Sequence, residues 1–94
     1  MNDKFLREQL QHKWDYPEYM LDSTILALKK MGTDLQEAFE NWMGSGTPPT
    51  ISVGKYNFQV LTGTFHLEPV AAFTTLDWLR RDYKSAEYTL RHQR

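Results

Sequence analysis

Apolar residues recur at helical spacing along most of the chain. Leu6, Leu10 and Trp14, for example, are spaced four positions apart near the N-terminus. Such spacing gathers apolar side chains on one face of a helix. The pattern predicts five helices, over residues 3–14, 17–31, 34–43, 69–81 and 85–92.

Capping residues set the expected boundaries of the N-terminal helices. Asp15 and Glu18 approximate a capping box ahead of the second helix, and Gly32 is suited to end that helix with a positive φ. Thr33 and Gln36 form a further capping box at once, which predicts an immediate restart.

The C-terminal half contains one clear helix start and one undecided stretch. Pro69 predicts the first turn of the helix over 69–81, and Ser85 is the expected cap of the last helix. Residues 51–67 fit either a hairpin with a type II′ turn at Gly54 and Lys55 or a short helix capped by Asn57. The periodicity leaves both open.

Together these elements indicate a mainly α fold, a small bundle of about five helices, with α+β as the alternative if 51–67 is a hairpin. The length of 94 residues fits a single domain over 1–94. Gly44 is expected to close the third helix. A Gly/Ser/Pro loop over 44–50 would then separate an N-terminal three-helix half from a C-terminal half.

Composition narrows the chemistry that the chain can perform. It has no cysteine, which excludes disulfides, thiolate nucleophiles and cysteine-ligated metals. The three histidines, His12, His66 and His92, lack the i, i+4 spacing of a helical metal site. We therefore expect no catalytic constellation, no metal and no cofactor, and a cytoplasmic protein without a membrane span.

Charge is divided unevenly along the chain. Residues 1–46 hold five Lys/Arg and eight Asp/Glu, whereas residues 47–94 hold six and four, so the halves carry −3 and +2. A helix-turn-helix-like segment over 57–81 followed by basic residues makes a small DNA- or RNA-binding domain one hypothesis. Its candidate contacts are Arg80, Arg81, Lys84, Arg91, Arg94 and the aromatic Tyr88.

Trp78 leads to the other hypothesis. On a helical wheel it lies about 160° from Leu76, together with Ala71, Thr74 and Arg81, so it cannot share the neighbour of the main apolar stripe. Either this helix is buried on two sides, or Trp78 and Arg81 are anchors of a protein interface.

We accordingly expect a non-catalytic protein-binding or adaptor domain, of the size of a prokaryotic or phage accessory protein, with a protein partner or a second copy of itself as ligand. Tyr16 and Tyr19, beside the restart at Pro17, are candidates to extend the interface.

Overall fold

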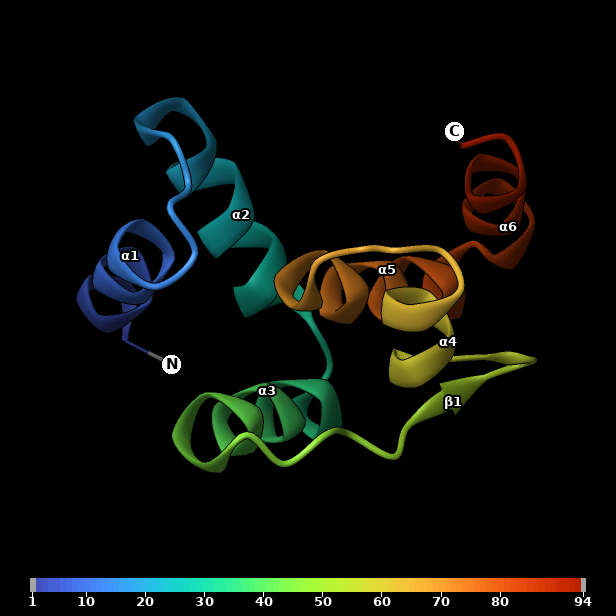
Figure 1. The fold of residues 1–94 in the computed structure, drawn as a ribbon, viewed down its shortest axis with the longest axis horizontal. Coiled ribbons are helices and arrows are strands. Elements are labelled where there is room, and N and C mark those ends of the chain that lie inside the picture. The colour runs from blue at the N-terminus through green and yellow to red at the C-terminus, as the bar shows by residue number, and fades with distance from the viewer. Residues whose placement is uncertain (1, 94) are drawn as a thin grey trace. The chain divides into compact units, whose positions relative to one another are not determined.

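The computed structural model describes residues 2–93, which form six helices and one two-stranded antiparallel sheet (Figure 1). The predicted mainly α class is confirmed. The chain divides into two compact units, Met1–Met31 and Gly32–Arg94. The Gly/Ser/Pro segment 44–50 therefore lies within the second unit, and the single domain over 1–94 stays a prediction.

The first unit is a helical hairpin of α1 (Asp3–His12) and α2 (Glu18–Lys30). The two helices pack against each other and bury one stripe of leucine and isoleucine each: Leu6, Leu10, Leu21, Ile25 and Leu28. Two ion pairs, Arg7 with Asp22 and Asp3 with Lys29, lie between the helices.

The turn between α1 and α2 is built differently from the expected capping box. Asp15 has a φ of 57°, and the backbone N–H of Tyr16 donates to the carbonyl of Leu10 at 2.9 Å. Pro17 is the N-cap of α2, with no side-chain cap hydrogen bond. Asp15 thus belongs to the turn that ends α1 and does not cap α2. Its positive φ lies in the left-handed region, which aspartate tolerates better than most residues.

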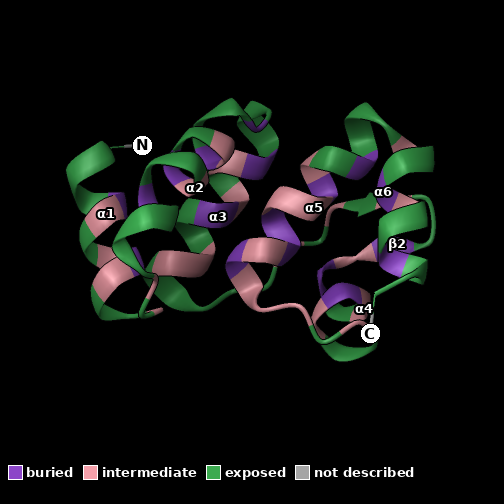
Figure 2. Cartoon of the chain, turned by 90° about the horizontal axis from the view of Figure 1, so that it is seen from above, coloured by how far each residue is buried: buried purple, intermediate pink, exposed green. Residues whose placement is uncertain are grey.

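The second unit contains α3 (Thr33–Ser45), β1 (Ser52–Val53), β2 (Tyr56–Asn57), α4 (Phe58–Gly63), α5 (Pro69–Arg81) and α6 (Tyr83–Arg91). Helix α5 packs against α3, α4, α6 and β1, and Figure 2 shows buried and intermediate residues over most of it. Helix α5 is therefore the centre of this unit.

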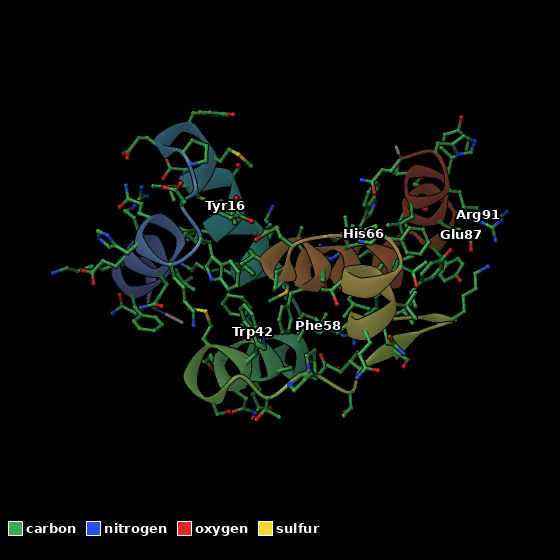
Figure 3. The ribbon with its side chains drawn as sticks, viewed as in Figure 1. Tyr16, Trp42, Phe58, His66, Glu87 and Arg91 are labelled. Atoms are coloured by element: carbon green, nitrogen blue, oxygen red, sulfur yellow. The ribbon has the colours of Figure 1, made fainter. Side chains whose placement is uncertain are left out.

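Aromatic rings from two other helices surround Phe73 on α5. Its ring is perpendicular to that of Phe39 on α3, with centroids 5.1 Å apart. The rings of Trp42 and Phe58, from α3 and α4, lie 5.7 and 5.3 Å from it (Figure 3). Aromatic pairs at these separations stabilise a core beyond the area they bury.

The boundaries of α3 differ from the prediction at both ends. Gly32 is the N-cap with a φ of −60°, so it does not use the positive φ that we expected, and Thr33 lies inside the helix without capping it. The helix continues through Gly44 to Ser45, and the left-handed C-cap is Gly46, with a φ of 76°.

Both interpretations of residues 51–67 are correct, for successive parts of the stretch. Ser52 pairs with Asn57 and Val53 with Tyr56 in a hairpin, whose turn places Gly54 at a φ of 60°. The Asn57 side chain then accepts a hydrogen bond from the N–H of Val60 at 2.8 Å and caps α4. One residue thus ends the strand and starts the helix.

A single residue also joins α5 to α6. Asp82 is the C-cap of α5 and the N-cap of α6, and its side chain accepts from the N–H of Ser85 at 3.3 Å. The predicted N-cap of the last helix, Ser85, therefore lies three residues beyond the observed N-cap. Asp82 directly follows α5 and already caps α6 with its carboxylate.

No helix among residues 2–93 is long and apolar enough to cross a membrane.

Candidate protein interface

Helix α5 is capped at its start. Pro69 occupies the first turn, and the Glu68 carboxylate accepts a hydrogen bond from the N–H of Ala71 at 3.1 Å. A carboxylate at this end also suits the helix dipole. Pro69 and Glu68 therefore specify where α5 begins.

The candidate face of α5 becomes more exposed towards its C-terminus. Ala71 and Thr74 are half-buried, and the Thr74 hydroxyl donates to the carbonyl of Ala71 at 3.1 Å. One turn further on, Trp78 is 39% exposed and Arg81 is exposed. The face we predicted is thus covered at its start and open at Trp78 and Arg81.

An acidic residue on the same helix orients Arg81. Its Nε lies 2.9 Å from an Asp77 oxygen, and the Asp77 side chain is only 13% exposed while that of Arg81 is 55% exposed. A partner that contacts Arg81 therefore meets a guanidinium whose position is already restricted. Pre-ordering of this kind lowers the entropy cost of binding.

Arg80, in contrast, links two helices of the second unit. Its Nη1 and Nη2 donate to both carboxylate oxygens of Asp34 on α3, each at 2.9 Å. The two hydrogen bonds lower the pKa of Asp34 and raise that of Arg80. A Cβ at Gly32 would lie 3.1 Å from the Arg80 guanidinium, so glycine leaves room for this pair.

Arg91 belongs to a cluster around Glu87 on α6 (Figure 3). The buried Tyr56 hydroxyl donates to Glu87 Oε2 at 2.8 Å, and Lys55 Nζ and Arg91 Nη2 lie 3.6 and 3.5 Å from the same oxygen. The hydrogen bond from Tyr56 lowers the pKa of Glu87, while burial, followed by the hydrogen bond to Glu87, raises the pKa of Tyr56.

This cluster holds the β-hairpin against α6. Local sequence patterns give no indication of it, because Tyr56 and Glu87 are distant in sequence and nothing near either residue specifies the other. The same is true of the contact between Arg80 and Asp34.

Two other candidate nucleic-acid contacts lie on the exposed face of α6. Tyr88 is 65% exposed, and its ring stacks on that of His92 with centroids 4.0 Å apart. Lys84, one turn before Tyr88, is exposed. Arg94, the last predicted contact, lies outside the described residues.

The shape predicted for residues 57–81 is present, as α4, a turn and α5. In a helix-turn-helix protein the N-terminal part of the second helix contacts the base edges. In α5 that part is mostly covered, since Val70, Ala72 and Phe73 are buried and Ala71 is half-buried. The segment therefore has the connectivity of the motif and lacks its exposed reading face.

The tyrosines expected to extend the interface belong to the first unit. Tyr16, at the end of the turn, is half-buried, while Tyr19 on α2 is 84% exposed. Trp78 belongs to the second unit, and the place of these residues in one interface remains a prediction.

Within residues 2–93, no group of three or more His, Asp or Glu side chains could hold a metal ion. No protein-family model, curated protein or solved structure matches the chain.

Proposed function

We propose that this protein is a non-catalytic, cytoplasmic adaptor or accessory domain that binds another protein through the C-terminal half of α5. The observation that carries the proposal is the exposure of Trp78 on a helix whose other large apolar residues are buried. Phe73, Leu76 and Leu79 are each no more than 1% exposed. Tryptophan and arginine are the residues most enriched among interface hot spots.

The ion pair that orients Arg81 supports the same surface as the binding site. A hot-spot residue is typically surrounded by a polar rim whose contacts exclude water. Trp78 provides the anchor, and the pair of Arg81 with Asp77 provides an oriented cation beside it.

The experiment compares the proteins that co-purify with the tagged chain from its native cells. Trp78→Ala and Arg81→Glu should each remove the same partner, whereas Glu40→Lys, a reversal of charge on the exposed side of α3, should retain it. Thermal unfolding of every variant shows whether the fold is kept. Retention of the partner by a folded Arg81→Glu variant, or its loss from Glu40→Lys, would contradict the proposal.

Nucleic-acid binding through α6 is the second candidate, and the exposed Tyr88 is the observation that favours it. An exposed aromatic ring beside Lys84 is suited to base stacking and to a phosphate contact. The pairing of Arg80 with Asp34 and of Arg91 with Glu87 reduces the available positive charge. A titration with single-stranded DNA and RNA at two salt concentrations tests it, because phosphate contacts weaken steeply with salt. No binding at low salt rejects this candidate.

A further inference from the structure

Residues 47–51, which we call the strap, join α3 to β1 (Figure 1). The strap has the sequence Thr-Pro-Pro-Thr-Ile. A proline ring fixes its own φ at about −65° and also disfavours the helical conformation at the preceding residue. Thr47 and Pro48 each precede a proline, so the sequence itself restricts the first half of the strap to extended conformations of the polyproline II type.

The strap also has the open backbone of a polyproline II segment, which contains no internal hydrogen bonds. Within residues 2–93, no hydrogen bond involves the backbone of residues 47–50. The two ends are nevertheless fixed. The Thr47 hydroxyl lies 2.8 Å from that of Ser45 at the end of α3, and Ser52 pairs with Asn57 in the hairpin. The strap is thus anchored at both ends and unpaired between them.

Open space lies on both sides of the strap. Towards α3, a hollow of about 360 Å³ is lined by the strap together with Glu37, Ala38 and Asn41. Towards the start of α4, a second hollow of about 310 Å³ is lined by the middle of the strap together with Asn57 and Gln59. Three of the first four residues of the strap are exposed. A partner can therefore reach this segment from either side.

These features fit one established mode of recognition. Domains that bind polyproline II segments hold them in grooves lined with aromatic side chains, and a segment that is already extended loses little entropy on binding. The charge beside the strap adds a further requirement. Glu37 is exposed and forms no ion pair within residues 2–93, whereas Asp34 in the same wall is paired with Arg80. A complementary groove therefore carries a Lys or Arg at its rim to face Glu37.

We propose that the strap is a docking site for a protein domain whose aromatic groove, with a basic rim, binds polyproline II segments. The strap shares no residue with the Trp78 surface of α5, so the two sites can fail separately. A chain with both sites would join two different proteins, which is the activity of an adaptor.

Titration of the isotope-labelled full chain with a panel of purified SH3 and WW domains tests the proposal by NMR. At least one domain, at up to about 1 mM, should shift the amide signals of Thr47, Thr50 and Ile51. Pro48→Ala should weaken that binding about tenfold, because it removes a ring contact and frees the backbone of the strap. Pro17→Ala is the matched control, since Pro17 is an exposed proline of the first unit.

Three results would overturn the docking site. The first is a panel in which no domain shifts the strap signals at about 1 mM. The second is a Pro17→Ala variant that is impaired as much as a folded Pro48→Ala variant. The third is a shift of the strap signals when the chain alone is concentrated, which would assign the strap to a second copy.

Charge reversal tests the basic rim of the groove. Glu37→Lys should weaken binding of the same domain, and the loss should shrink as the salt concentration rises, because salt screens exposed charges. Glu8→Lys makes the same change at an exposed position of α1 in the first unit and should bind as the wild type does. Equal affinities of the Glu37→Lys variant and the wild type would overturn the assignment of a basic rim.

Discussion

Replacement of Gly54 by alanine tests how tightly the β-hairpin is held against α6. Gly54 has a φ of 60°, and an added Cβ would lie 2.7 Å from the Tyr83 hydroxyl oxygen and 2.9 Å from a ring carbon, Tyr83 Cε2. Two separate costs therefore arise: an alanine in the left-handed region, and a tyrosine ring that must move. The ring of Tyr83 in turn lies 5.9 Å from that of the buried Tyr56.

The magnitudes of these costs follow from general values. The left-handed region costs an L-residue about 1–2 kcal/mol, and forcing an extra carbon into a packed site costs about 1–3 kcal/mol more. We expect Gly54→Ala to lower the free energy of unfolding by about 2–5 kcal/mol. That is a large fraction of the stability of a small domain.

Two further glycines separate the contributions. Gly46 has a φ of 76° with no atom near an added Cβ, and Gly63 is helical with open space around it. Gly46→Ala should therefore show only the backbone cost, about 1–2 kcal/mol. Gly63→Ala should stabilise α4 by about 0.5–1 kcal/mol, because alanine loses less backbone entropy in a helix.

Urea unfolding followed by circular dichroism measures all three variants. A double-mutant cycle with Tyr83→Ala isolates the steric part: without the ring, Gly54→Ala should cost no more than Gly46→Ala. If Gly54→Ala already costs as little as Gly46→Ala in the wild-type background, the Tyr83 ring moves aside without cost. The hairpin is then not held tightly against α6.

Three other predictions concern the core, an ion pair and a helix end. Trp42→Ala should cost about 3–5 kcal/mol, because the half-buried Trp42 ring packs against those of Phe39 and Phe73. Trp78→Ala should cost clearly less, because 39% of that residue is already exposed; urea unfolding compares the two, and equal losses would argue that Trp78 is a core residue. The pKa of Asp34 is lowered in the folded state, so its pair with Arg80 stabilises the protein above about pH 4 and this contribution is lost as the pH falls through the lowered pKa. Asp34→Asn should thus cost about 0.5–1 kcal/mol at pH 7 and much less at pH 2, and a cost independent of pH would exclude the charge as its cause. His66 has a φ of 58°, so His66→Gly should raise the free energy of unfolding by about 1 kcal/mol; a lower melting temperature would show that the imidazole makes a stabilising contact.

Local patterns predict the helices of this protein well where the decisive residues are neighbours in sequence. The bounds of α5 match the expected 69–81, because Pro69 and the apolar stripe act within the helix itself. The stretch from 51 to 67 was ambiguous because Gly54 and Asn57 each specify a correct but different structure. Only their order along the chain shows that the hairpin comes first and the helix second.

Predictions fail where a distant residue decides. Gly32 followed by Thr33 has the pattern of a positive-φ helix end and a capping box, yet Gly32 keeps a negative φ and stands beside the Asp34–Arg80 pair. The arginine that explains the small residue is more than forty positions away. Nothing in the residues around Gly32 could have indicated a close approach by α5.

The same limit applies to function, since the basic residues of the C-terminal part look equivalent in sequence and are not equivalent in the fold. Arg80 joins two helices, Arg91 lies in the Glu87 cluster, and Lys84 is exposed. Neutralising Arg80 or Arg91 would therefore alter stability along with any binding, and a loss of affinity could not be assigned to a phosphate contact. Lys84→Gln removes a charge from solvent alone, so a change in the salt dependence of binding for that variant reports on a surface contact. An adaptor that binds through Trp78 should be indifferent to Lys84→Gln and sensitive to Arg81→Glu, which makes this pair of variants the sharpest separation of the two proposed functions.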